Sequence, residues 1–326
     1  MKKKATNIFK NQKIIFIVRK SLKIYKYFIY NFFSINTVLK KKLFLRPTIV
    51  KQKIENICLN ILRRYLRSNL FKFNNNSFSS KAKYKRSNKR YFCTYGDDKF
   101  IKSRERIVIE AEMTGLFDNC FFYTDISLPG DEFFNVKQDS KLFCEVASSE
   151  RIGGCGLWKP YILFKTLKEL NDGDILVYSD AGCTIKTDKN SINQLEDLIS
   201  EIEKSWEGII AVRNSFIEQN WTKGDVFEYF EVYNDSNFTN TKQFSSGRLH
   251  IAKKCKHALS IYSQWWEIAK VRPELFSDSP SLVPNLSGFI ENRHDQSIWS
   301  LLCKKFSVIE KKDLDLFPIE PSRICK

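Results

Sequence analysis

The sequence of 326 residues predicts an α/β fold, with a mostly parallel sheet that is flanked by helices on both faces. From residue 90 onward, short β-prone apolar runs alternate with longer segments that have apolar residues at helical spacing. The clearest run lies in Asp172–Cys183, where an acidic turn leads into Ile-Leu-Val-Tyr and a carboxylate, Asp180, follows soon after. Ligands of open α/β sheets bind beyond the carboxyl ends of such buried strands, so Asp180 is the first candidate site residue.

Four strands are expected in the globular part of the chain. Arg90–Tyr95 is aromatic and β-prone, and Gly96-Asp97-Asp98 breaks it. The other three strands are expected at 119–124, 175–178 and 208–212. The strand at 175–178 is expected at the centre of the sheet, because its apolar run is typical of a buried strand.

Five helices are expected between and after these strands. Ser103 can cap the first helix, which runs to Gly115. Pro160 suits the first turn of the second helix, which continues over 161–170 with apolar residues on one face. The remaining helices are expected near 192–204, after Thr222 and at 295–305.

Charge divides the chain in two. Residues 1–90 carry 25 Lys and Arg against one acid, Glu55, whereas the rest carries 29 basic and 36 acidic side chains. The net charge of +17 therefore belongs to an extension of the chain and not to its globular part. We expect a basic, helical, amphipathic extension at 1–73, a polar linker at 74–88, and a catalytic domain at 89–326 that is long enough for its own core.

The extension has the pattern of a segment that lies on a membrane surface. Drawn as a helix, 13–33 places Lys and Arg on one arc and apolar residues on the other. Its longest stretch without a charge, 27–39, is shorter than the roughly 20 residues that cross a bilayer, and no signal-peptide cleavage site follows it. We expect a cytoplasmic protein held peripherally to an anionic membrane. A poorly ordered Lys-rich leader is one alternative, and nucleic-acid binding, for which no module is recognisable, is another.

The nine cysteines are widely spaced, odd in number and accompanied by only three His. This spacing is typical neither of a zinc site nor of a disulfide framework, so we expect free thiols in a reducing compartment. Cys155, within Gly153-Gly154-Cys155-Gly156, has no supporting motif for a role as a nucleophile.

Two clusters lie near the central strand. In Ser179–Gly182, the Asp180 carboxylate can orient a ribose or hold a metal against a diphosphate, or it can merely cap a turn. In Gly153–Tyr161, glycines permit close approach to a ligand, and Lys159 stands before a helix whose amino end attracts anions. The alternative for this second cluster is a flexible loop with a buried Trp158.

Two further clusters open helices. In Trp221–Asp225, Lys223 can contact a donor or an acceptor, although a solvated helix start explains it equally well. In Asn292–Gln296, crowded Arg, His, Asp and Gln side chains offer acid, base and amide groups. Among the three His, His294 is the strongest candidate for a metal ligand or a base, while Asp295 can also serve simply as a helix cap.

Together and in this order, the clusters resemble glycosyltransferases of the GT-A fold, a Rossmann-like fold of the nucleotide-diphospho-sugar transferases. The resemblance covers about residues 90–310. It rests on Thr94–Asp97, Trp158–Tyr161, Asp172–Gly182, Gln243–Gly247 and Arg293–Gln296. By this resemblance, Asp295 and Gln296 form an Asp-Gln pair near a donor sugar.

We therefore expect a glycosyltransferase that moves a sugar from a nucleotide sugar to a glycan, lipid or protein acceptor in surface polysaccharide biosynthesis. The expected catalytic residues are Asp180, His294 and Asp295. The expected substrate-binding residues are Trp158, Lys159, Tyr161, Ser179, Gly182, Lys223, Gln243, Gly247, Arg293 and Gln296. The alternative is a non-catalytic protein of the same fold that binds a sugar nucleotide or a glycan.

The candidate residues offer two ways to neutralise a bound diphosphate. Enzymes that this chain resembles often have two carboxylates one residue apart, of which the second holds a divalent cation, and that second position is Gly182 here. Either Asp180 shares Mn²⁺ or Mg²⁺ with His294 or Asp295, or Lys159 and Lys223 neutralise the diphosphate without a metal. We expect a metal, with Asp180 and His294 as its ligands.

Overall fold

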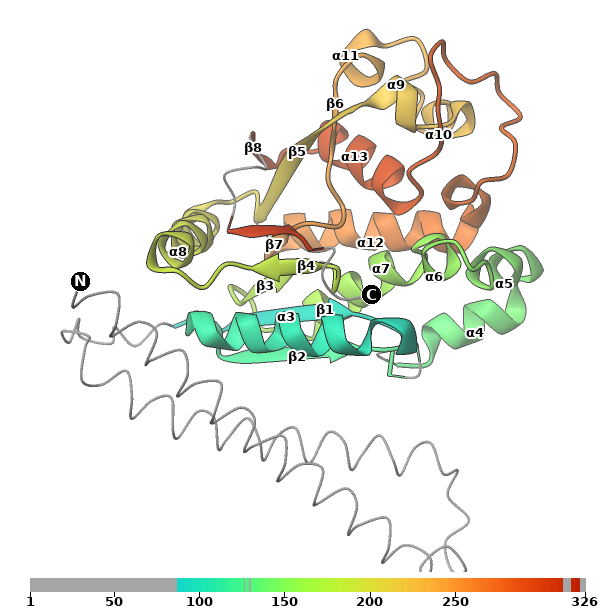
Figure 1. Cartoon of the computed structure of the whole chain (residues 1–326). Coiled ribbons are helices and arrows are strands. Elements are labelled where there is room, and N and C mark those ends of the chain that lie inside the picture. Colours follow the sequence, from blue (N-terminus) through green and yellow to red (C-terminus); the bar gives the residue numbers. More distant parts are fainter. Residues whose placement is uncertain (1–86, 126, 129, 313–317, 323–326) are drawn as a thin grey trace, which may run out of the picture. The chain divides into compact units, whose positions relative to one another are not determined.

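A computed structural model describes residues 87–125, 127–128, 130–312 and 318–322 of the chain (Figure 1). The expected extension at 1–73 and nearly all of the expected linker at 74–88 lie outside these residues. No helix in the described part of the chain is long and apolar enough to cross a membrane.

The centre of the fold is one sheet of seven strands in the order β2-β1-β3-β7-β5-β6, with β8 paired to β5. Two short strands, β4 and β9, form a second sheet. The strands are β1 (Arg90–Tyr95), β2 (Asn119–Tyr123), β3 (Ile175–Tyr178), β4 (Cys183–Ile185), β5 (Ile209–Ile217), β6 (Lys242–Phe244), β7 (His250–Lys253), β8 (Ile309–Lys311) and β9 (Ile319–Pro321).

The direction of the strands confirms the expected mostly parallel sheet. Strand β1 pairs in parallel with β2 and β3, and β8 pairs in parallel with β5. Strand β7 runs antiparallel between β3 and β5, and β6 runs antiparallel to β5. Consequently β1, β2, β3, β5 and β8 all point the same way, and their carboxyl ends lie at one edge of the sheet.

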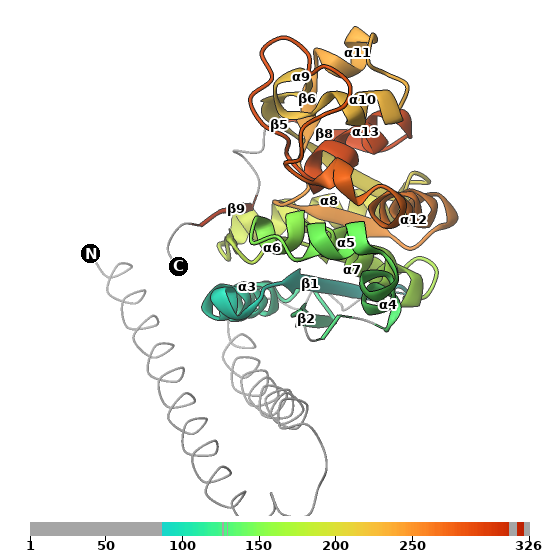
Figure 2. The ribbon, with the colours of Figure 1, turned by 90° about the vertical axis from the view of Figure 1, so that its right-hand side faces the viewer.

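Helices cover both faces of the sheet, as expected. They are α3 (Ile101–Thr114), α4 (Glu132–Asp139), α5 (Lys141–Ala147), α6 (Ile152–Cys155), α7 (Trp158–Glu169), α8 (Lys189–Lys204), α9 (Glu218–Trp221), α10 (Gly224–Tyr229), α11 (Ser236–Thr239), α12 (Lys256–Val271) and α13 (Asp295–Lys305). Helices α7 and α12 lie side by side (Figures 1 and 2). The short helices α9, α10 and α11 gather with α13 at the end of the domain where β5 and β6 lie.

Two apolar cores form because the central strand is apolar on both faces. Leu176 and Tyr178 of β3 pack into one core with α7, α12 and α13. Ile175 and Val177 of the same strand pack into the other core with α3 and α8. Successive side chains of a strand point to opposite faces, so an uninterrupted apolar run is what a sheet covered on both sides requires.

The expected strands and helices are present, but strands β4, β6, β7, β8 and β9 and helices α4, α5, α6, α9 and α11 are additional. Ser103 does not cap the first helix; it is buried inside α3, and a 3₁₀ turn at Asp98–Phe100 leads into that helix. Strand β5 continues past the expected end to Ile217, and this outer part pairs with β6. The sixteen-residue helix α12, with Trp265 and Trp266 buried, is not among the expected elements.

Candidate active site

A cavity of about 1200 Å³ opens at the carboxyl ends of β3 and β5. Its wall includes the outer half of β5, the loop between β6 and β7, and the start of α13. The lining residues are Ile152, Lys159, Asp180, Gly182, Cys183, Arg213, Asn214, Ser215, Phe216, Ile217, Asn240, Thr241, Lys242, Ser245, Ser246, Gly247, Arg248, Arg293, Asp295, Gln296, Glu310, Lys312 and Pro321. Six of these are basic and three are acidic, so the cavity carries an excess of positive charge.

Asp180 stands at the rim of the sheet because two hydrogen bonds tie the end of β3 to the β6–β7 loop. The Ser179 hydroxyl donates to the carbonyl of Arg248 at 2.7 Å, and the Asp180 amide donates to the carbonyl of Gly247 at 2.8 Å. Gly247 leaves room for the Asp180 carboxylate, which a β-carbon at this position would strike. The position of Asp180 at a strand end is therefore as the sequence predicts.

Lys159 lies between two carboxylates. Its Nζ is 3.2 Å from Oδ1 of Asp180 and 2.9 Å from Oδ2 of Asp295. The Lys159 side chain is 3 % exposed and that of Asp295 is 5 % exposed, whereas that of Asp180 is 38 % exposed and faces the cavity. The structure thus joins α7, the end of β3 and the start of α13 through three charges.

Hydrogen bonds hold the two carboxylates from the protein side. The Tyr178 hydroxyl donates to Oδ1 of Asp180, and the Ser246 hydroxyl donates to Oδ2 of Asp295 at 2.7 Å. Because these donors fix the orientation of each carboxylate, Lys159 has a defined position between them. The arrangement is a pre-organised ionic cluster at the wall of the cavity.

Burial and charge act in opposite directions on this cluster. Burial by itself would lower the pKa of Lys159, but the negative charges of Asp180 and Asp295 outweigh it and raise that pKa above its ordinary value. Burial among protein atoms raises the pKa of Asp180, although Lys159 and the Tyr178 hydroxyl both act to lower it. Lys159 is therefore charged at neutral pH.

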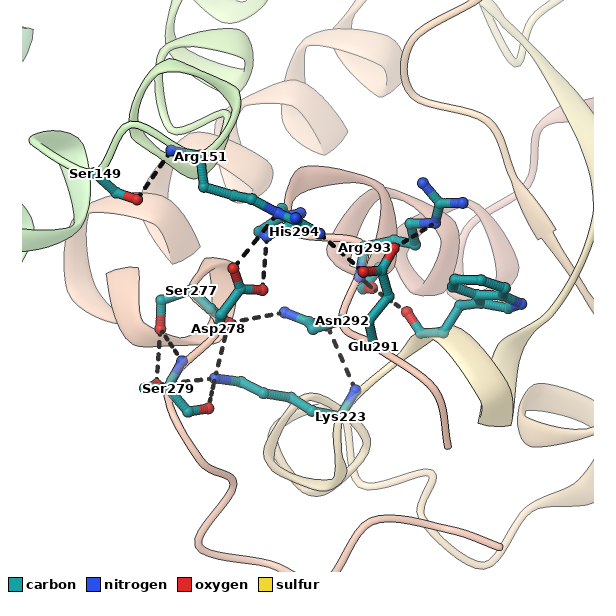
Figure 3. A network of polar contacts seen from close by, with 12 residues as sticks. Ser149, Arg151, Lys223, Ser277, Asp278, Ser279, Glu291, Asn292, Arg293 and His294 are labelled. Atoms are coloured by element: carbon teal, nitrogen blue, oxygen red, sulfur yellow. Dashed lines mark hydrogen bonds and ion pairs between the residues drawn. The ribbon is translucent and has the colours of Figure 1, made fainter. Parts of the chain in front are cut away.

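The start of α13 turns adjacent side chains in different directions. His294 has a backbone φ of 54°, which is unusual for a residue other than glycine. Arg293 and Asp295 line the cavity, and the Arg293 guanidinium carbon lies 4.3 Å from the ring centre of Phe216 and 4.5 Å from that of Trp221. Figure 3 shows His294 directed instead toward Asp278.

His294 belongs to a separate polar network. Its Nε2 is 2.9 Å from Oδ1 of Asp278, and Oδ2 of Asp278 lies 3.5 Å from Nε of Arg151 (Figure 3). Lys223 extends into the same region, where its Nζ donates to the carbonyl of Glu274 at 2.6 Å. Both Lys223 and Asp278 line a second cavity, of about 340 Å³. Neither His294 nor Lys223 lines the larger cavity.

Three other expected site residues, Trp158, Tyr161 and Ser179, are buried and do not line the cavity. Trp158 stacks on Tyr95 with ring centres 3.8 Å apart, and Tyr161 is fully buried 4.8 Å from Trp266, so neither aromatic residue lines the cavity. Ser179 is likewise fully buried.

Gln243 and Gln296 form an amide pair, of which only Gln296 lines the cavity. Gln243 is buried and donates to the carboxylate of Glu218 at 3.0 Å, while its own Oε1 accepts from Gln296 at 2.7 Å. Gln296, together with Gly182, Gly247 and Arg293, does line the cavity. Of the substrate-binding residues expected from sequence, these four and Lys159 are therefore the ones that lie on its wall.

The glycine-rich segment approaches a side chain of the protein itself. A β-carbon on Gly156, whose φ is 74°, would stand 2.8 Å from Oδ1 of Asp295. The free thiol of Cys155 is buried within this segment, and burial raises its pKa, which disfavours the reactive thiolate. The seven cysteines in the described part of the chain are all free thiols, as expected.

The donor groups do not fit the expected metal. His294 is engaged by Asp278, so the structure does not bring it together with Asp180 as ligands of one ion. Asp180 and Asp295 do approach each other, but the ammonium of Lys159 occupies the space between them. Across the described ranges, no group of three or more His, Cys, Asp or Glu side chains could hold a metal ion.

Sequence reasoning missed several residues of the cavity. Arg248 and Ser246 lie in the β6–β7 loop, Lys242 begins β6, and Arg213 lies on the unpredicted outer half of β5. The signals in the sequence are the Gln243–Gly247 stretch of the resemblance and the Ser-Ser-Gly-Arg run at 245–248, which has the small and polar residues of a connection between strands. Nothing in that run reveals which other segments it faces.

Solved structures with similar folds were found by comparison. The apo form of the glycosyltransferase GlyE of Streptococcus pneumoniae TIGR4 has a TM-score of 0.36 and 13% identity, over 70% of this chain and 46% of that one. Mouse xyloside xylosyltransferase 1 in its apo form has a TM-score of 0.39 and 12% identity, over 69% and 85%. A glycosyltransferase involved in glycosylation of the major capsid of PBCV-1 has a TM-score of 0.31 and 9% identity, over 69% and 81%.

With TM-scores of 0.31 to 0.39, these likenesses carry no conclusion about the activity of this chain. This chain spans about half of the length of GlyE, and at these identities the likeness concerns the fold alone. The sequence matches no protein-family model and no curated protein. The roles of the cavity residues therefore have to be argued from their own chemistry.

Proposed function

We propose that this protein is a glycosyltransferase that moves a sugar from a nucleoside-diphosphate sugar to a hydroxyl group of a glycan, lipid or protein acceptor. The observation that carries the proposal is the cluster of Lys159, Asp180 and Asp295 at the wall of a large cavity with an excess of basic side chains. The cavity lies at the carboxyl ends of the strands, where ligands of α/β sheets bind. The resemblance noted in the sequence supports the same class.

The charge of the cavity suits a diphosphate. Arg248 and Arg293 line it, and the Arg293 guanidinium is held by two aromatic rings. A planar guanidinium can bind phosphate oxygens through two parallel hydrogen bonds. The cavity volume of about 1200 Å³ leaves room for a nucleotide sugar and part of an acceptor, because pockets for small ligands commonly measure about 300–1000 Å³.

Asp180 is the carboxylate best placed to contact the substrate, because its side chain faces the cavity and that of Asp295 is almost fully buried. In the proposed reaction, the bond between the anomeric carbon and the diphosphate oxygen breaks, and the acceptor oxygen bonds to that carbon. The acceptor proton passes to a base, and the nucleoside diphosphate leaves with its electron pair. We assign sugar orientation to Asp180 and positioning of the cluster to Asp295.

A thermal-shift screen of nucleotides and nucleotide sugars, followed by assay of nucleoside-diphosphate release, tests this function. We expect one donor to raise the melting temperature and to be turned over, and Arg293→Ala to weaken its binding by about 10-fold or more. Arg272→Ala, at the residue that precedes the η2 turn (Pro273–Phe276), is the matched control because Arg272 does not line the cavity. Binding without turnover would instead favour the non-catalytic alternative. No binding would contradict the transferase and leave only a glycan as the ligand of that alternative.

We also propose that residues 1–73 attach the enzyme to the cytoplasmic surface of an anionic membrane, while residues 89–326 form the catalytic domain. The support is the confinement of the excess basic charge to the extension. A membrane-attached enzyme would act on a lipid-linked acceptor in surface polysaccharide biosynthesis. The acceptor assay should therefore include both soluble glycans and glycolipids.

A further inference from the structure

The ionic cluster in the cavity wall contains its own cation. The Nζ of Lys159 lies 2.9 Å from Asp295 and 3.2 Å from Asp180, which are distances of direct ion pairs. The ammonium enters from α7, beneath the cavity, and its side chain is almost fully buried. A cation at this point neutralises carboxylate charge that would otherwise face a bound diphosphate.

The carboxylate oxygens that face this point are already occupied. Oδ1 of Asp180 accepts from Tyr178 as well as from Lys159, and Oδ2 of Asp295 accepts from Ser246 as well as from Lys159. A divalent ion between the two aspartates would have to displace the ammonium. Such an ion would also lack a third carboxylate ligand beside Asp180 and Asp295. The position two residues after Asp180, at the cavity rim, is Gly182, which has no side chain to ligate it.

The rest of the cavity supplies further positive charge without a metal. Arg248, Arg293, Lys242 and Lys312 all line it. Hard divalent ions such as Mg²⁺ and Mn²⁺ require several oxygen ligands in near-octahedral geometry, which two engaged carboxylates do not provide. The cavity therefore suits an anionic ligand that is bound by Lys and Arg side chains and not by a metal ion.

We infer that Lys159 takes the place of a divalent cation between Asp180 and Asp295, so that the cavity binds a nucleoside diphosphate without an added metal ion. This inference rests on the proposed function and narrows it to a metal-independent enzyme. Lys159 is a positioning residue: it fixes both carboxylates and cancels one of their two charges. The basic side chains of the wall then hold the diphosphate.

The test is calorimetric titration of the full-length protein with UDP, GDP, ADP and CDP in turn, first in EDTA and then in Mn²⁺. We expect one nucleoside diphosphate to bind with dissociation constants that agree within about threefold in the two conditions, because no metal bridges the ligand. Binding that appears only with Mn²⁺ would overturn the inference and leave the proposed function in place. Binding of none of the four in either condition would overturn the proposed function and the inference with it.

Variants of α7 add a second measurement. Lys159→Ala should weaken binding in EDTA by about 10-fold or more, because two carboxylates would then repel the diphosphate. Mn²⁺ should recover part of that loss in Lys159→Ala, since the space between the aspartates is vacated, and should change nothing in the wild type. Lys168→Ala, an exposed lysine of the same helix, is the control and should bind like the wild type. Unchanged binding by folded Lys159→Ala would contradict the inference. If that variant fails to fold, the wild-type titration in EDTA and in Mn²⁺ decides the inference by itself.

Discussion

Gly156 and Asp295 lie so close together that a β-carbon on Gly156 would stand 2.8 Å from Oδ1 of Asp295. The glycine precedes α7, which carries Lys159, and the aspartate opens α13. The close approach therefore seats the carboxylate beside the lysine that it pairs with. A segment that reads in the sequence as a ligand-binding glycine loop acts in the structure as packing space for a charged side chain.

Gly156→Ala should reduce turnover by about 10-fold or more, because the added methyl group displaces Asp295 from Lys159. It should also lower the free energy of unfolding by about 1–3 kcal/mol, since φ at this position is 74°. Gly115→Ala is a matched control: its φ is 69°, but a β-carbon there would meet nothing within 4 Å. Denaturant unfolding and a turnover assay of both variants would check this, and equal turnover by the two would contradict it.

Asp180→Asn should lower turnover by about 100-fold or more while the protein stays folded, because an amide orients a sugar hydroxyl less strongly and no longer pairs with Lys159. Asp295 remains as a partner of Lys159, which limits the loss of stability. Asp197→Asn, at an exposed position of α8, is the control. Wild-type turnover in an Asp180→Asn protein of unchanged melting temperature would remove Asp180 from the active site.

His294 should prove to be a structural residue. His294→Ala loses the contact with Asp278 and keeps the positive φ, whereas His294→Gly loses the same contact and relieves the backbone. We therefore expect the glycine variant to be more stable than the alanine variant by roughly 1 kcal/mol. At His257, inside α12, the order should reverse because glycine weakens a helix. Chemical denaturation measures all four, and a more stable His294→Ala would argue against strain at this position.

His250 should make the domain sensitive to acid. Burial, aided by the charge of Lys159, lowers the pKa of His250 from 6.5 to about 3, so the native protein holds it neutral. Its contribution to stability is complete above pH 6.5 and is lost as the pH falls from there toward 3, by roughly 1 kcal/mol for each pH unit. In His250→Gln the free energy of unfolding should fall less steeply over this range than in wild type. Identical slopes in the wild type and His250→Gln would refute the assignment.

Removal of residues 1–73 should release the protein from anionic vesicles without abolishing activity on a soluble acceptor, because the excess positive charge is confined to that segment. Binding of the full-length chain should weaken as salt is raised, since charged contacts are screened. Vesicle co-sedimentation of both proteins at low and high salt provides the measurement. Equal binding of the truncated protein would place the membrane contact elsewhere.

Local patterns in the sequence identified the elements that frame the site. The run Ile175–Tyr178 is apolar on both faces, which only a strand covered on both sides explains, and Asp180 follows it at the sheet edge as expected. Helix α12 is not among the expected elements, although its buried residues have helical spacing. Element type follows from side-chain period and cap residues, which are local properties.

The tertiary structure decided which of the candidate residues meet. Lys159, Asp180 and Asp295 come from three separate candidate clusters, and no pattern in the sequence indicates that one ammonium lies between the two carboxylates. His294 is adjacent to Asp295 in the chain, yet the positive φ at His294 sends its side chain to Asp278. Such pairings depend on how whole elements pack across the sheet, and packing is determined by contacts between residues far apart in the chain.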